Sequence, residues 1–395
     1  MTRKKYSKIS EKIDGQPMFK TLEKIKQLEN QGKHVIHFEI GDPDFQTPTN
    51  IIKSAYDAMM NGFTHYTSSY GLAEFRQEIC KATKNSRGFL PTMDQVLVTP
   101  GANIAIYYAV LCLANPGDEV IVPDPGFPTY YSTLKICNVV PARIPLKEKN
   151  DFRMLPKDIE KKINSKTKMI IINSPQNPTG AVMTKEEIKE IYDIAKKHNL
   201  HLYSDEIYAR MTYDDSEFFS PSVFDKCKER TIISNGFSKA FAMTGWRLGA
   251  VIGPKKIIEK MGLLLQTTSS CVSPFIQKAG IEAISGKQTK IKKMMKEYQH
   301  RRDIFVEELN KIPKIKCVKP GGAFYIFANI KETGKNSNEI SEFLLKDANV
   351  AVLPGTDFGK YGEGYIRLCY ATSLENILLG VKRIKKSFDK LSESK

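Results

Sequence analysis

Short apolar segments alternate with amphipathic segments through the middle of the chain. The apolar runs end at polar residues or at glycine, and they cover residues 118–123, 168–173, 200–204, 231–234 and 248–252. Continuous apolar strands of this length are typical of a parallel sheet that is covered on both faces. The pattern therefore predicts an open α/β sheet in this part of the chain, with helices between its strands.

The clearest helical pattern lies between two of these strands, at residues 185–198. Its apolar positions recur at helical spacing, and they are Ile188, Ile191, Tyr192 and Ala195. Thr184 and Glu187 stand three residues apart at its start, which is the spacing of a capping box. The segment thus predicts an amphipathic helix that packs its apolar side on the sheet.

A different pattern follows the last of these strands. It predicts a long charged helix at 288–311, a strand at 322–329, a helix at 338–346, strands at 351–353 and 364–369, and a final helix at 374–391. This order is typical of a smaller α+β unit. We therefore expect a large α/β domain over 48–287, with a mostly parallel sheet between helices, and a small α+β domain formed by 1–47 and 288–395.

Length and charge narrow the class of protein. A chain of 395 residues is long enough for two packed units. Its longest apolar run, Ile104–Ala114, is shorter than the roughly 18–20 residues that span a bilayer, so no membrane segment is expected. Lys and Arg number 60 against 44 Asp and Glu, a net charge of +16. The basic stretch at 382–386 lies on an amphipathic helix, so we interpret the excess as surface charge rather than as a nucleic-acid site.

The positions of the cysteines and histidines indicate the cellular compartment and whether a metal site is expected. The chain has seven cysteines, an odd number, and none forms a Cys-x-x-Cys pair. This usage is typical of reduced thiols in a cytoplasmic protein. The pairs His34/His37 and His198/His201 have no Cys or Glu partner at zinc spacing, so no metal site is expected.

Polar residues follow the predicted strands where ligands bind in open α/β sheets, beyond the carboxyl ends. The strand at 168–173 leads into Asn173–Gly180, the next leads into Asp205–Tyr208, and the third leads toward Lys239. Earlier, the small-residue turn at 100–103 opens an apolar helix, and such a helix start is suited to a phosphate.

Together these residues resemble a known family, the class I/II aminotransferases that use pyridoxal phosphate and have fold type I. The resemblance runs from about Ile36 to the C-terminus. Its motifs occur in the order of the family, and they are Gly41–Phe45, Tyr66 with Gly71, Gly101–Asn103, Asn177–Gly180, Ser204–Tyr208, Ser238-Lys239 with Thr244–Gly249, and Gly364–Arg367.

The resemblance implies a set of cofactor contacts. Lys239 would hold the cofactor aldehyde as a Schiff base and then move protons. Asp205 would face the pyridine nitrogen, while Asn177 and Tyr208 would donate to the ring oxygen. The phosphate would be held, and the ring stacked, by a further group of residues: Gly101, Ala102, Asn103, Ser238, Arg247, Phe127, and Tyr66 of a neighbouring subunit. Gly236 stands where many members have a serine, which removes one expected phosphate contact.

The resemblance also implies substrate contacts. Arg367 would bind the α-carboxylate as a bidentate fork, with Asn177 and the backbone of Gly41 beside it. Phe19, next to Met18, falls where substrate side chains are often met, which indicates an apolar or small group. Asn103 argues against aspartate, because relatives specific for dicarboxylates often have a lysine at that position, or else use an arginine from the partner subunit.

The expected activity is a transamination between an amino acid and a 2-oxo acid, in amino acid metabolism or biosynthesis. The alternative is a lyase or decarboxylase on the same scaffold, acting on an amino acid that could be phosphorylated, because the motifs do not fix which bond breaks. A cytoplasmic homodimer with shared active sites is expected, with no nucleic-acid partner. A non-catalytic basic binding protein is disfavoured by the intact residue set around Lys239.

Overall fold

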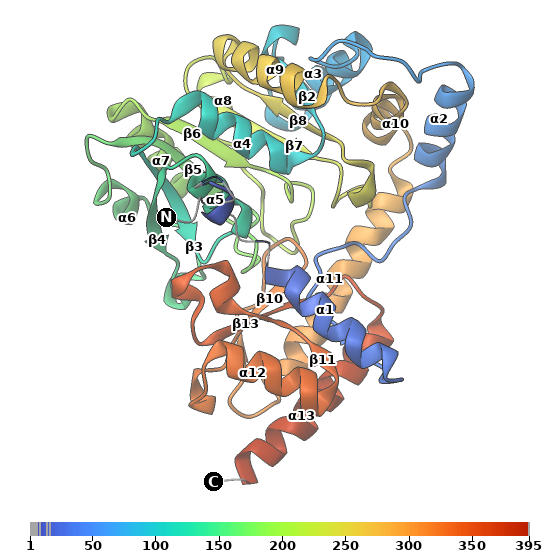
Figure 1. Cartoon of the computed structure of the whole chain (residues 1–395), viewed down its shortest axis with the longest axis vertical. Coiled ribbons are helices and arrows are strands. Elements are labelled where there is room, and N and C mark those ends of the chain that lie inside the picture. Colours follow the sequence, from blue (N-terminus) through green and yellow to red (C-terminus); the bar gives the residue numbers. More distant parts are fainter. Residues whose placement is uncertain (1–6, 8, 13–14, 16, 394–395) are drawn as a thin grey trace, which may run out of the picture.

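The computed structural model describes residues 7, 9–12, 15 and 17–393. Figure 1 shows an upper lobe built on a large sheet and a lower lobe that holds the C-terminal part of the chain. The large sheet has the strand order β2 (Val96–Thr99), β8 (Gly249–Ile252), β7 (Thr231–Gly236), β6 (His201–Asp205), β5 (Thr167–Asn173), β3 (Glu119–Asp124) and β4 (Val140–Pro145). This α/β architecture confirms the predicted fold class.

Strand direction confirms the prediction of a mostly parallel sheet. Strands β7, β6, β5, β3 and β4 pair in parallel. The strand predicted at 248–252 is β8, and it runs antiparallel to both β7 and β2. The connection from β7 to β8 contains only the short η4 (Thr244–Trp246), whereas a parallel return needs a crossover, usually an α-helix.

Strand β4 was not predicted, because it contains Pro141 and Pro145. Proline cannot donate a ladder hydrogen bond, and it is tolerated in edge strands. The position of β4 at the end of the strand order is such an edge.

Helices cover both faces of the large sheet. One face carries α4 (Ala102–Leu113), α5 (Pro128–Ile136) and α9 (Lys255–Ser269). The other carries α2 (Thr49–Met60), α3 (Ala73–Arg87), α6 (Pro156–Glu160), α7 (Lys185–Lys197) and α10 (Pro274–Ser285). Neighbouring residues of β7 show the alternation, because Ile232 packs in the cluster with α9 and Ile233 in the cluster with α3.

The predicted helix at 185–198 is α7. The Thr184 hydroxyl accepts from the backbone N–H of Glu187 at 3.2 Å, and the Glu187 carboxylate accepts from the backbone N–H of Thr184 at 2.9 Å. The predicted capping box is therefore confirmed.

The lower lobe contains a four-stranded antiparallel sheet in the order β12 (Leu353–Pro354), β13 (Tyr365–Cys369), β10 (Tyr325–Asn329) and β9 (Lys316–Cys317). Around it lie α1 (Pro17–Asn30), α11 (Thr289–Asn310), α12 (Ser337–Phe343) and α13 (Leu374–Glu393). Strand β1 (Ile36–His37) pairs in parallel with β11 (Val350–Ala351), which joins the N-terminal segment to C-terminal elements. The domain boundaries at 48 and 288 stay a prediction.

The connections contain short helical turns: η1 (Ser10–Lys12), η2 (Met93–Gln95), η3 (Glu148–Asn150), α8 (Ser222–Asp225), η5 (Lys331–Thr333), the π-helical η6 (Leu344–Ala348), η7 (Gly355–Phe358) and η8 (Lys360–Gly362). All seven cysteines are free thiols. Within the described part of the chain, no helix combines the length and the apolar character that a membrane crossing requires.

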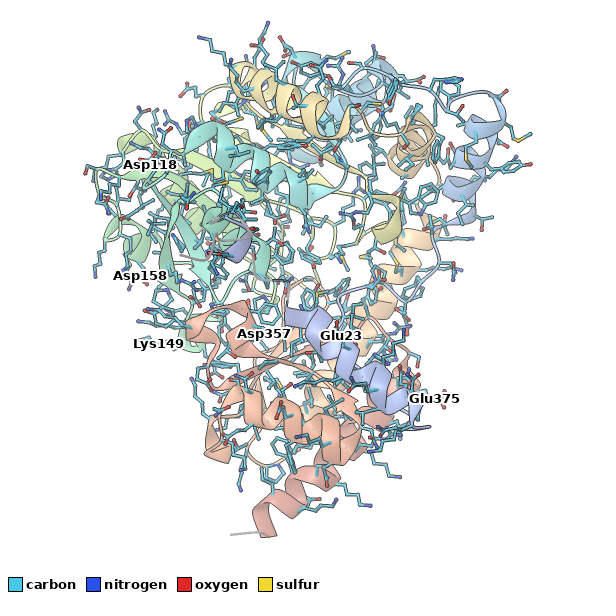
Figure 2. The ribbon with its side chains drawn as sticks, in the orientation of Figure 1. Glu23, Asp118, Lys149, Asp158, Asp357 and Glu375 are labelled. Carbon is cyan, nitrogen blue, oxygen red and sulfur yellow. The ribbon has the colours of Figure 1, made fainter. Side chains whose placement is uncertain are left out.

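Side chains form a continuous layer around both lobes (Figure 2). Lys149 at the edge of the upper lobe and Glu23 on α1 are exposed charged residues of this layer. Asp357 lies at the junction of the two lobes, where it lines a small cavity together with Met18 and Phe127. The predicted site residues converge near this junction of the two lobes.

Candidate active site

A cavity of about 200 Å³ lies at the carboxyl ends of the large-sheet strands, against the lower lobe. Its lining includes most of the predicted site residues, which are Gly41, Ala102, Asn103, Phe127, Asn177, Asp205, Tyr208, Ser238, Lys239, Arg247 and Arg367. It also includes residues that the sequence analysis did not assign to the site, which are Asn173, Ile207, Thr244 and Tyr325. The polar strand ends therefore do meet in one place.

Lys239 reaches this cavity from the segment that follows β7. Its Nζ donates a hydrogen bond to the backbone oxygen of Gly41. Burial lowers the pKa of Lys239 to about 8, and the nearby positive charges of Arg367 and Arg247 act in the same direction. At pH 7.5 a lysine with that pKa is about a quarter neutral, against roughly 0.1% for an ordinary lysine, and only the neutral amine is a nucleophile.

Asp205 ends β6 and is 5% exposed. Its Oδ2 accepts a hydrogen bond of 2.6 Å from the Tyr130 hydroxyl, and burial raises the pKa of Asp205 to about 6. A buried carboxylate without a cation is costly, so the site is suited to a ligand that presents a positive charge here.

The neighbouring carboxylate of Glu206 points to the other face of the strand. It is fully buried and pairs with the Arg87 guanidinium. Successive residues of a strand face opposite sides, so Glu206 has a structural role away from the cavity that Asp205 lines.

Arg367 lies on β13 in the wall formed by the lower lobe, and it is 3% exposed. Its Nη1 donates to Asn177 Oδ1 at 3.3 Å, and its Nη2 donates to the backbone oxygen of Glu39. The guanidinium carbon lies 4.5 Å from the ring centre of Tyr325 and 4.8 Å from that of Phe358. Nε is buried and has no hydrogen-bond partner among the described residues, so this cation retains capacity for an anionic ligand.

Tyr208 and Tyr325 meet beside Arg367. Their hydroxyl oxygens are 2.7 Å apart, and both side chains are buried. Burial raises the pKa of Tyr208 well above its usual value, so its hydroxyl stays protonated and can donate to a ligand.

The start of α4 forms the opposite end of the cavity. Gly101 precedes the helix with φ of 86°, and no side chain caps the first turn. A Cβ on Gly101 would lie 2.4 Å from Arg247 Nη2, so the arginine rests directly on this helix start. Uncapped backbone N–H groups, the helix dipole and a guanidinium together form a site for a phosphate.

Three predicted residues are not part of the cavity lining. Gly101 is the first, and it lies directly against the Arg247 guanidinium at the start of α4. Tyr66 is 88% exposed, and it does not line the cavity within the single chain. The side chain of Phe19 lies outside the described part of the structure, whereas Met18 beside it does line the cavity.

The residues present fit pyridoxal phosphate, whose chemistry needs an amine, a carboxylate at the ring nitrogen, donors at the ring oxygen and an anion site. Lys239 supplies an amine of lowered pKa, and Asp205 a buried carboxylate that forms no ion pair with any described residue. Tyr208 and Asn177 supply hydrogen-bonding groups, and the uncapped start of α4 supplies the anion site.

Tyr130 and Tyr325 were missed by the sequence analysis. Tyr130 lies 75 residues before Asp205, and Tyr325 lies 117 residues after Tyr208. No local motif marks either residue, so only the folded chain brings them to their partners.

Comparison with known proteins extends over nearly the whole chain. A family model described as "Aminotransferase class I and II" matches residues 33–384. An aspartate aminotransferase of Pyrococcus horikoshii is 43% identical over 357 residues, which are 90% of this chain and 91% of that protein. The aromatic-amino-acid aminotransferase 2 of Thermococcus litoralis is 39% identical over 89% of this chain and 91% of its own length. The solved aspartate aminotransferase of Rhizobium meliloti superposes with a TM-score of 0.94 at 30% identity, covering 98% of this chain and 99% of that one.

Proposed function

This chain belongs to the class I and II aminotransferases, and from that premise we propose the roles of its site residues and its substrates. It is an enzyme that uses pyridoxal phosphate to move an amino group between an amino acid and a 2-oxo acid. When bound, the cofactor supplies an aldehyde that captures the amino group and a ring that accepts electrons. The observation that supports the proposed roles is the convergence of Lys239, Asp205 and Arg367 on one cavity.

In this proposal Lys239 is the catalytic residue. Its amine would hold the cofactor through the aldehyde, and it would then accept and return the proton that is attached to the substrate Cα. Its lowered pKa supports both roles, because the neutral amine attacks the aldehyde and also accepts a proton.

The remaining contacts hold and tune the cofactor. Asp205 would pair with the ring nitrogen, while Asn177 and Tyr208 would donate to the ring oxygen. The phosphate and the ring face would be held by Gly101 at the start of α4 and by lining residues, which are Ala102, Asn103, Ser238, Arg247 and Phe127. These assignments rest on the positions of the side chains around one cavity.

The substrate α-carboxylate binds Arg367, with Asn177 and the backbone of Gly41 beside it. A buried guanidinium with an unused N–H supports this role, because a planar fork recognises a carboxylate by paired hydrogen bonds. A surface arginine would not be held between two aromatic rings as this one is.

For the side chain of the substrate we propose an aromatic or other apolar group rather than a second carboxylate. The cations in the described lining are Lys239, Arg247 and Arg367, and each already has a role. Met18 and Phe127 offer apolar surface instead. The two relatives above act on different amino acids by their names, so their similarity leaves this choice open.

A panel of amino donors tests this preference. We expect phenylalanine or tyrosine to have a kcat/KM at least about tenfold above that of aspartate, because desolvating an unpaired carboxylate costs more than 1.4 kcal/mol. The rate of 2-oxo acid release is the measurement. The variant Asn103→Lys, which places a cation at the start of α4, is expected to shift the ratio toward aspartate. A higher kcat/KM for aspartate in the unmodified enzyme would contradict the proposal.

We also propose that the enzyme is a cytoplasmic homodimer whose active sites are shared. Tyr66 is 88% exposed in the single chain and would reach the phosphate of a neighbouring subunit. Leu111 on α4 and Leu263 on α9 are 41% and 53% exposed on the same face of the sheet, which offers apolar surface to a second copy. The seven free thiols favour a reducing compartment.

Mixed dimers test the shared site. Subunits carrying Lys239→Ala and subunits carrying Tyr66→Ala are each expected to be poorly active as homodimers at limiting cofactor. In a mixed dimer one site combines Lys239 of one subunit with Tyr66 of the other, so the co-expressed mixture should recover about a quarter of the unmodified activity. Recovery no greater than that of the Tyr66→Ala homodimer would show that each chain completes its own site.

A further inference from the structure

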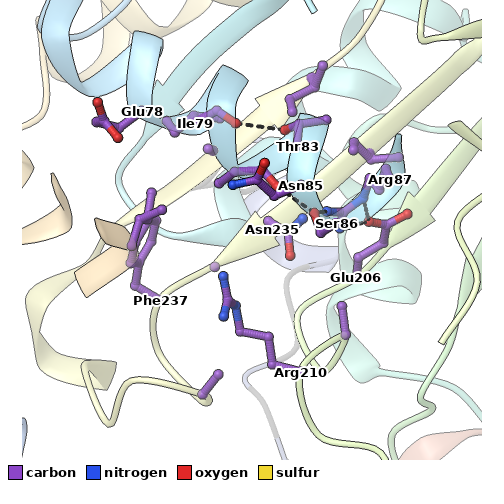
Figure 3. A pocket seen from close by; sticks show the side chains of 18 of the residues that line it. Glu78, Ile79, Thr83, Asn85, Ser86, Arg87, Glu206, Arg210, Asn235 and Phe237 are labelled. Atoms are coloured by element: carbon purple, nitrogen blue, oxygen red, sulfur yellow. Dashed lines mark hydrogen bonds and ion pairs between the residues drawn. The ribbon is translucent and has the colours of Figure 1, made fainter. Parts of the chain in front are cut away.

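A second cavity, of about 640 Å³, lies behind the active site in the large lobe. It opens between α3, the strands β7 and β8, and the segment 206–210 that follows β6. Figure 3 shows Arg210 extending from that segment toward Asn235, while Arg87 and Glu206 face one another at one side.

The cavity belongs to the face of the sheet that α3 and α10 cover. The exposed apolar residues of α4 and α9 are on the opposite face, so a dimer formed through them would leave this cavity open. Ile207 lines both this cavity and the active site. A ligand here would therefore contact the reverse side of the segment that carries Asp205 and Tyr208.

Most charges in the cavity are already paired. The Arg87 guanidinium binds Glu206, whose other oxygen accepts from the Ser220 hydroxyl. The amide oxygen of Asn235 accepts a hydrogen bond from Arg87 Nη2 at 2.8 Å. At the rim, Lys81 pairs with Glu78 at 2.6 Å. These groups have little remaining capacity for a ligand.

Arg210 is different, because its positive charge is not compensated. It is an exposed residue that lines the cavity, and it forms no ion pair with a described carboxylate. Its guanidinium carbon lies 5.2 Å from the ring centre of Phe241. Surrounding protein and the positive charge of Arg87 lower the pKa of Arg210, so an anion beside it would relieve both effects.

The remaining wall is apolar. It is formed by the side chains of Ile79, Phe218, Ile233, Phe237, Phe241 and Ile252. One free positive charge beside such a wall matches a molecule with one negative charge and an apolar body. A zwitterionic amino acid is less suitable, because Glu206 and Glu78 are already occupied by cations.

We propose that this cavity is a second ligand site, that its ligand is an organic monocarboxylate with an aromatic or branched aliphatic body, and that Arg210 binds the carboxylate. The site is independent of the amino donor and of the transamination chemistry.

The test uses the holoenzyme and 3-(4-fluorophenyl)propanoate, which has neither an amino nor an oxo group to react. Its binding is followed by fluorine NMR and calorimetry. Because Arg367 can also bind a carboxylate, the measurement is made in the Arg367→Leu variant, where one bound species per chain is expected to remain. Adding Arg210→Leu should weaken that binding by about tenfold or more, since a charge-assisted hydrogen bond is lost.

Two matched variants and one matched probe complete the design. Lys81→Leu, at the rim, should change the affinity little, and Arg210→Lys should retain part of it. The alcohol 3-(4-fluorophenyl)propan-1-ol should bind much more weakly than the acid. The melting temperature of each variant is also measured, and affinities are compared only between proteins whose melting temperature is unchanged. The proposal is overturned if Arg367→Leu binds no probe, if binding is insensitive to Arg210→Leu, or if the alcohol binds as well as the acid.

Discussion

Replacing Lys239 with alanine is expected to lower kcat by about 10⁴-fold or more, because one amine both carries the cofactor and moves the proton at the substrate Cα. Alanine at 239 leaves the cavity lining otherwise intact. The measurement is single-turnover release of the 2-oxo acid. Reduction with borohydride followed by mass spectrometry should find the cofactor mass on the unmodified chain and not on the variant.

An added small amine separates chemistry from structure in this experiment. Methylamine can enter the space left by the Lys239 side chain and is expected to restore part of the lost rate. Lys278→Ala is the matched control, because Lys278 pairs with Glu74 away from the cavity. Near-normal turnover by Lys239→Ala without an added amine would show that another group is the catalytic residue.

Site residues near strand ends could be predicted because their signal is local. Asn177 follows β5, Asp205 ends β6 and Lys239 follows β7, so an apolar run with polar residues after it already indicates them. The carboxyl ends of parallel strands meet at one sheet edge, so residues that are distant in the sequence come together there in one site.

Features that depend on distant contacts could not be predicted. Tyr130 and Tyr325 reach Asp205 and Tyr208 only through the fold. The direction of β8 depends on its short connection to β7, and an apolar run of four residues does not reveal it. The contact proposed for Tyr66 lies outside the single chain altogether.

The adjacent carboxylates Asp205 and Glu206 should give opposite results when each is replaced by its amide. Asp205→Asn is expected to lower kcat by about 10²–10³-fold, because the charge at the cofactor ring nitrogen is lost. The amide oxygen can still accept from the Tyr130 hydroxyl, so the fold is retained. Glu206→Gln should change kcat little but lower the free energy of unfolding by about 3 kcal/mol, because it removes the negative charge that compensates the Arg87 guanidinium.

The stability of the cofactor-free protein provides a second test of Asp205. The pKa of Asp205 is about 6 in the folded chain, above its unfolded value of 3.8, so ionisation of this carboxyl opposes folding as pH rises through that range. At pH 7 Asp205→Asn should therefore raise the free energy of unfolding of the cofactor-free protein by up to about 3 kcal/mol, and the gain should vanish below about pH 4. Urea unfolding at pH 4 and pH 7 measures it. The opposite result, a cofactor-free Asp205→Asn variant that is less stable than its parent at pH 7, would contradict this. It would show that the folded chain already stabilises the ionised carboxylate without the cation of a ligand.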